Sequence, residues 1–199
     1  MNMNLPNKLT VMRIIMIPFF MVFILLPDAG ASKVWCDFIA ALIFGAASLT
    51  DMYDGKIARE RGLVTDFGKF LDPIADKFLV LGAFFCFIVS EEFAAYRYVF
   101  SMIVFIVIFR ELAVTSLRMI AQSAEGVVIA ANWLGKVKTV SQIIFILVAL
   151  LEEHIFFFSS FMVNFRPLTV ASCLVMLIFT VISGINYIKG YWKFLDPTK

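Results

Sequence analysis

Residues 97–120 read RYVFSMIVFIVIFRELAVTSLRMI, a segment long and apolar enough to cross a lipid bilayer as one helix. A bilayer core about 30 Å thick requires roughly 20 mainly apolar residues, because a spanning backbone must satisfy its own hydrogen bonds. The same test, applied outward along the chain, predicts six spans at about 8–27, 34–59, 68–90, 97–120, 136–152 and 167–189. The fifth is the least regular, because charged residues at 152–154 interrupt it before a phenylalanine-rich run that can lie along the membrane interface.

Composition supports a membrane protein. Of the 199 residues, 62% are hydrophobic and 16% charged, and the mean hydropathy is +0.94. A soluble domain is nearer half apolar and a quarter charged. We therefore expect one all-α, six-helix transmembrane domain over residues 1–199, and the net charge of +2 gives no indication of nucleic-acid binding.

Lysine and arginine positions predict the orientation. Cytoplasmic loops carry an excess of these residues, and a cytoplasmic N-terminus leaves only Lys33, Arg97 and Arg166 of the 17 on the opposite side. Both termini are therefore predicted to be cytoplasmic. An alternative for the first span is a cleavable secretory signal, since basic residues and an apolar run precede the small residues 29–31.

Four aspartates flank the link between the second and third spans. Asp51 and Asp54 are three residues apart and Asp72 and Asp76 four apart, so each pair shares one helix face. The short link makes the two helices antiparallel neighbours and brings the pairs to a similar depth. Clustered carboxylates repel and are costly in a membrane. Two Mg²⁺ or Mn²⁺ ions would relieve both problems and form a clamp suited to phosphoryl chemistry.

Small residues accompany the aspartates. Gly55 and Ala58 lie one turn apart beside the first pair, and Gly68 lies one turn before Asp72. They can let a substrate approach the backbone, and the alternative is that they let helices pack closely. Beside four aspartates, we expect substrate access.

The spaced pattern DxxDGxxAR, eight residues, then GxxxDxxxD resembles the signature of the CDP-alcohol phosphotransferases. Every specified position is present: Asp51, Asp54, Gly55, Ala58, Arg59, Gly68, Asp72 and Asp76. The resemblance implies a six-helix membrane enzyme, usually a homodimer, that transfers a phospho-alcohol unit from a CDP-alcohol to an acceptor hydroxyl and releases CMP.

The resemblance also implies residue roles. The four aspartates would hold two metal ions, and Asp76 would also act as the base on the acceptor hydroxyl. Gly55 and Ala58 would make room for the cytidine moiety, and Arg59 would contact the diphosphate. Gly68, Asn7 and Thr10 would complete the CDP-lipid side of the site.

Three cations in the fourth and fifth spans predict an acceptor phosphate site: Arg110, Arg118 and Lys136. Arginine suits phosphate because it offers bidentate contacts. The alternative is a structural partner for Arg110, either an aspartate or Glu111. Adjacent helix residues point about 100° apart, however, so we do not expect Arg110 to face Glu111 directly. Lys138 is expected to mark the membrane interface.

Segments 5–13, 70–77, 110–118 and 134–139 resemble one branch of the family in particular. Enzymes of this branch transfer the phosphatidyl group of CDP-diacylglycerol to sn-glycerol 3-phosphate, and the resemblance implies a bacterial-type inner or plasma membrane. Alternative acceptors are inositol phosphate, serine or a phospholipid. A different class, a divalent-cation transporter, would need charges across the whole bilayer. The carboxylates at 91, 92, 152 and 153 are expected to be exposed in loops, which argues against a transporter. His154 is expected to lie on the surface.

Overall fold

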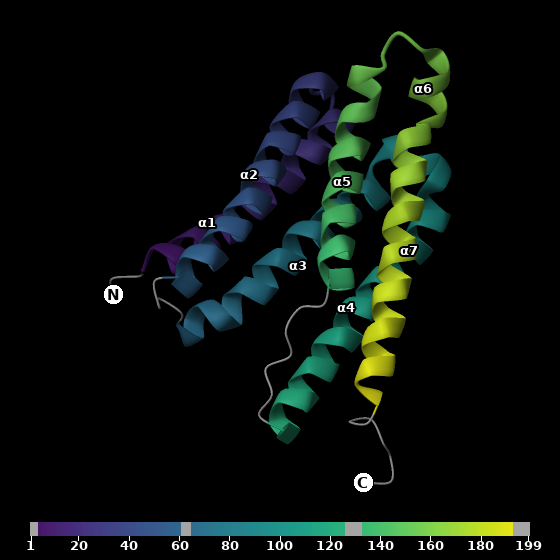
Figure 1. The fold of residues 1–199 in the computed structure, drawn as a ribbon. Helices are drawn as coiled ribbons and strands as arrows, with labels where there is room; N and C mark the ends of the chain where they lie inside the picture. Colours follow the sequence, from purple (N-terminus) through teal and green to yellow (C-terminus); the bar gives the residue numbers. More distant parts are fainter. Residues whose placement is uncertain (1–3, 61–64, 126–132, 193–199) are drawn as a thin grey trace. The chain divides into compact units, whose positions relative to one another are not determined.

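A computed structural model describes the backbone of residues 4–60, 65–125 and 133–192, and the side chains at 52–60, 66, 69 and 121–125 lie outside the described part. Throughout these ranges the ordered elements are helices, which confirms the all-α prediction (Figure 1). In chain order they are α1 (Leu5–Leu25), η1 (Leu26–Ala29), α2 (Lys33–Glu60), α3 (Asp66–Val89), η2 (Glu91–Tyr96), α4 (Arg97–Glu125), α5 (Trp133–Ile155), α6 (Ser160–Phe165) and α7 (Pro167–Gly190).

Several helices have the length and composition of membrane spans. Within the described residues, five segments qualify: Leu5–Ala29, Lys33–Asp51, Glu91–Ile120, Trp133–Ile155 and Ser160–Gly190. They correspond to five of the six predicted spans and support a multi-pass membrane protein. Helix α3 has 24 residues but does not qualify, because every stretch of spanning length within it includes Asp72, Asp76 and Lys77. The third span stays a prediction.

The chain forms two compact units. The first unit comprises residues 1–97 and 146–166. Within it, α1 lies between α2 and α3. Helices α2 and α3 contact each other much less than each of them contacts α1. Ile17, Phe20 and Ile24 form the buried apolar face of α1. The Phe20 ring lies 5.5 Å from the Phe44 ring of α2. The two helices that carry the aspartates are therefore connected mainly through α1.

The second unit comprises residues 98–145 and 167–199, so α5 contributes to both units. Within the second unit, α4 packs against the first part of α5, where the rings of Phe100 and Phe145 lie 5.6 Å apart. Helix α4 also packs against α7, since the Arg110 guanidinium donates to the Ser183 hydroxyl. Polar side chains thus connect the apolar helices of this unit.

Candidate active site

The aspartates lie at facing ends of two helices in the first unit. Asp51 and Asp54 are in the last turns of α2, and Asp72 and Asp76 are in the first turns of α3. Asp51 and Asp72 are close enough for their charges to interact. The side chains of Asp54, Gly55, Ala58 and Arg59 fall outside the described residues, so their predicted roles stay predictions.

Three buried polar residues lie along one side of α1, and we call them the polar edge of α1: Asn7, Thr10 and Arg13. They are 8%, 1% and 1% exposed, and their spacing of three places them on one helix face. Arg13 Nη1 donates to Asp51 Oδ1 at 2.6 Å, and Thr10 Oγ1 donates to Asp72 Oδ1 at 2.6 Å. Helix α1 therefore bonds to one motif aspartate of α2 and to one of α3.

The start of α3 is fixed by the same edge. Thr65 caps the helix, with its Oγ1 accepting from the Gly68 amide at 3.1 Å and donating to Asn7 Oδ1 at 3.0 Å. A Cβ at Gly68 would lie 3.0 Å from Asn7 Oδ1, closer than ordinary packing allows. Gly68 therefore packs closely against Asn7 of α1, and its predicted role in substrate access stays a prediction.

The carboxylates suit a hard divalent cation by their chemistry, because Mg²⁺ and Mn²⁺ prefer oxygen ligands. The Asp51 side chain is 40% exposed although its partner Arg13 is only 1% exposed, so the carboxylate remains accessible from one side. Among the described side chains, no three His, Cys, Asp or Glu residues group closely enough to hold an ion. Asp51 and Asp72 thus provide a described part of the predicted ligand set.

In the second unit, Glu111 pairs with two cations. Arg110 Nη1 lies 3.1 Å from Glu111 Oε1, and Lys138 Nζ contacts the same oxygen. The expectation that Arg110 and Glu111 do not meet is wrong, because both side chains are long enough to bend together although their Cβ atoms diverge. Lys138 is only 5% exposed, and its assignment to the membrane interface stays a prediction.

Tyr187 of α7 contacts both arginines of the predicted acceptor phosphate site, Arg110 and Arg118. The sequence did not point to this tyrosine. Arg118 Nη2 donates to the Tyr187 hydroxyl at 2.6 Å. The Arg118 and Arg110 Cζ atoms lie 5.1 and 5.7 Å from the Tyr187 ring centroid, within cation–π range. The available signal was the spacing of Ser183 and Tyr187, polar groups one turn apart in an apolar helix. Lys136 is exposed on α5.

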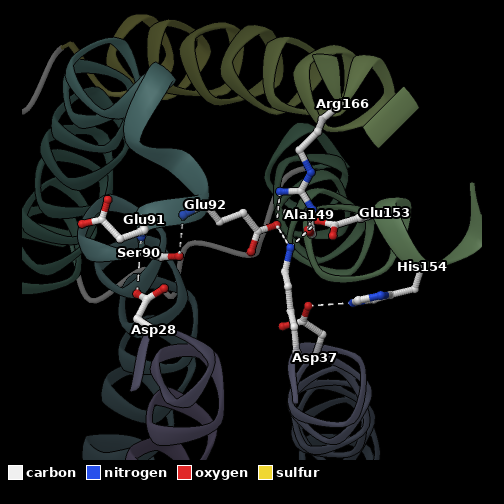
Figure 2. Close-up of polar contacts among 10 residues, drawn as sticks. Asp28, Asp37, Ser90, Glu91, Glu92, Ala149, Glu153, His154 and Arg166 are labelled. Atoms are coloured by element: carbon white, nitrogen blue, oxygen red, sulfur yellow. Dashed lines mark hydrogen bonds and ion pairs between the residues drawn. The ribbon is translucent and has the colours of Figure 1, made fainter. Parts of the chain in front are cut away.

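A second polar cluster lies in the first unit, at the end of α1 remote from its polar edge (Figure 2). Lys33 pairs with Glu153, Arg166 pairs with Glu92, and His154 Nε2 lies 2.7 Å from Asp37 Oδ2. The side chain of His154 is 7% exposed.

These contacts correct the expectation that the residues at 152–154 are exposed. Glu152 is 1% exposed, and His154 lies against α2 because tertiary packing closes over the end of α5. Arg166 ends α6 in the left-handed region, with φ 44°, and donates to the Ala149 carbonyl at 3.0 Å. The charged side chains of this cluster pair with one another.

Comparison with known proteins decides the family. A model of the CDP-alcohol phosphatidyltransferase family matches residues 3–183. The chain belongs to this family. CDP-alcohol phosphatidyltransferases generally depend on divalent metal ions, which agrees with the oxygen-rich chemistry of the aspartate ends of α2 and α3.

Three curated relatives carry the name CDP-diacylglycerol–glycerol-3-phosphate 3-phosphatidyltransferase. The chain is 41% identical over 202 residues to that of Bacillus subtilis (strain 168), covering 98% of each protein. It is 39% identical over 145 residues to those of Escherichia coli (strain K12) and Salmonella typhimurium (strain LT2), covering 72% of this chain and 75% of each relative.

Proposed function

We propose that this protein transfers the phosphatidyl group of CDP-diacylglycerol to a hydroxyl of sn-glycerol 3-phosphate, giving phosphatidylglycerol phosphate and CMP. The observation that carries the proposal is the pairing of Asp51 and Asp72, from opposite sides of the DxxDG…GxxxDxxxD motif, with the polar edge of α1. The names of the relatives support the donor and the acceptor.

The proposed chemistry is a direct displacement. Asp51, Asp54, Asp72 and Asp76 hold two Mg²⁺ or Mn²⁺ ions, which, when bound, stabilise the charge on the phosphoryl oxygens. Asp76 takes the proton from the acceptor hydroxyl as its oxygen bonds to the β-phosphorus. The bond from that phosphorus to the bridging oxygen breaks, and CMP departs with the electron pair.

The remaining motif residues orient the donor. Gly55 and Ala58 leave room for the cytidine, and Arg59 neutralises the diphosphate. Asn7, Thr10 and Gly68 border the same side of the site, where they also fix the start of α3.

The acceptor phosphate binds Arg110, Arg118 and Lys136 in this proposal. Support comes from the second unit, where Glu111 pairs with Arg110 and Lys138, so that these two cations together with Arg118 and Lys136 carry more positive charge than Glu111 balances. Tyr187 holds the two guanidinium groups in position. A planar guanidinium so held can offer two parallel N–H donors to a phosphate.

We further propose that residues 1–199 work as one catalytic domain with six spans and both termini in the cytoplasm. The protein would form a homodimer among the lipids of a bacterial-type inner or plasma membrane. The segments with spanning character and the bias of Lys and Arg to one side support this arrangement.

The test is CMP release by purified, detergent-solubilised protein from CDP-diacylglycerol, with Mg²⁺ or Mn²⁺ against EDTA. Acceptors are glycerol 3-phosphate, inositol, inositol phosphate and serine. We expect metal-dependent release with glycerol 3-phosphate alone. Release with another acceptor would retain the aspartate mechanism and overturn the acceptor assignment.

Replacing Asp76 by Asn should abolish CMP release while the protein stays folded, because an amide cannot accept the hydroxyl proton. Asp28→Asn is the matched control, since Asp28 is an exposed carboxylate that accepts a hydrogen bond from the Glu91 amide. Full activity of the Asp76 variant would refute the base assignment.

A further inference from the structure

Arg13 is a cation in the interior of α1 whose partner is a motif aspartate. Its side chain is 1% exposed, whereas that of Asp51 is 40% exposed. A guanidinium stays charged in proteins, and a buried charge requires a partner. Asp51 meets that need through Oδ1 while part of its carboxylate remains open.

The Thr10 contact repeats this arrangement one turn earlier. Thr10 is 1% exposed, and its hydroxyl donates to Asp72 on the other aspartate-bearing helix. Because α2 and α3 contact each other little and both pack on α1, α1 controls how Asp51 and Asp72 lie relative to each other. If the Arg13 and Thr10 contacts only stabilised helix packing, they would not need to involve one motif aspartate on each of α2 and α3.

We propose that Arg13 and Thr10 are positioning residues for the metal site: Arg13 orients the carboxylate of Asp51, and Thr10 orients that of Asp72. This inference rests on the proposed function, because it assumes that these aspartates bind metal. Groups that hydrogen-bond to metal ligands typically change metal affinity by about 10- to 100-fold when removed.

The experiment measures Mn²⁺ binding to the purified full chain by electron paramagnetic resonance, with no substrate present. Arg13→Met keeps an unbranched apolar stem but removes the guanidinium group and its charge, and we expect it to weaken Mn²⁺ binding about 10- to 100-fold. Arg13→Lys should recover part of the affinity, because it restores the charge without the planar fork. Thr10→Val keeps the side-chain shape and should weaken binding several-fold.

Arg166→Met is the matched control. Arg166 is a buried arginine of the same unit, 5% exposed, but its partners are Glu92 and Ala149. We expect this variant to lose thermal stability and to keep wild-type Mn²⁺ affinity.

The possible results separate the positioning role from the metal assignment. Wild-type Mn²⁺ affinity in both Arg13→Met and Thr10→Val would overturn the positioning role and leave the proposed function intact. If Arg13→Met does not fold, Thr10→Val and Arg13→Lys decide the question. A wild-type protein that binds no Mn²⁺ would overturn the metal assignment itself, and the positioning role with it.

Discussion

Replacing Tyr187 by Phe should weaken the use of glycerol 3-phosphate without affecting CDP-diacylglycerol. The change removes one atom, the hydroxyl that accepts a hydrogen bond from Arg118 at 2.6 Å. It keeps the ring, whose centroid lies 5.1 and 5.7 Å from the two guanidinium carbons. Arg118 then loses its orientation while Arg110 retains its contact.

The size of the effect follows from the contacts that are lost. A hydrogen bond to a charged group contributes about 1.5–3 kcal/mol, and partly exposed Arg118 regains some of this from water. About 1.4 kcal/mol is a tenfold change in an equilibrium constant, so the KM for glycerol 3-phosphate should rise roughly 3- to 10-fold. Tyr187→Leu also removes two cation–π contacts of about 0.5–1 kcal/mol each, which adds roughly another 5- to 30-fold.

The assay is initial-rate CMP release with glycerol 3-phosphate varied at saturating CDP-diacylglycerol, and then the reverse. Tyr191→Phe is the control, because its ring stacks on Tyr187 at 6.1 Å and this change keeps the ring. We expect its KM values to match those of the wild type.

A lower melting temperature of Tyr187→Phe and Tyr187→Leu with an unchanged KM for glycerol 3-phosphate would contradict the acceptor role. Tyr187 would then stabilise the contact between α4 and α7, and its arginines would not bind the acceptor. An equal rise in both KM values would also count against a role limited to the acceptor.

Two further changes test the second unit. Gly184→Ala places a Cβ 3.0 Å from Arg110 Cγ, so Arg110 must shift. We expect a several-fold higher KM for glycerol 3-phosphate and a near-normal melting temperature. An unchanged KM would contradict this expectation. Glu111→Gln leaves the buried cations Arg110 and Lys138 without their anion, which should destabilise the fold by about 3 kcal/mol. Thermal unfolding in detergent measures this loss, and Glu91→Gln, at an exposed carboxylate, is its control.

The sequence predicted the helices well because their signal is local. A run of apolar residues of bilayer length forms a helix whatever its neighbours are, since the backbone has no other way to satisfy its hydrogen bonds. The aspartate motif was likewise readable, because spacings of three and four place side chains on one face. Helix α3 lacked a clear spanning signal for the same local reason, the charges in its first turns.

Contacts between helices were less accessible from the sequence. The link between α2 and α3 suggested that they are direct neighbours, but α1 packs between them, and nothing in the periodicity of α1 identifies its partners. Arg13 was therefore visible only as a basic residue near the N-terminus. The Arg110–Glu111 contact was missed because a rule about Cβ directions does not limit where long side chains end.

The position of α1 between α2 and α3 has a consequence for membrane insertion. Arg13 and Asp51 are 38 residues apart in the chain, and synthesis at about 5–20 residues per second separates their emergence by roughly 2–8 s. During that interval the first hydrophobic segment carries an arginine whose counter-ion has not yet been synthesised. An arginine costs about 2.5–3.5 kcal/mol at the bilayer centre and less toward its edge. We expect the nascent first segment to remain at the translocon or at the lipid surface until the second arrives, so that the two enter the bilayer as a neutral pair.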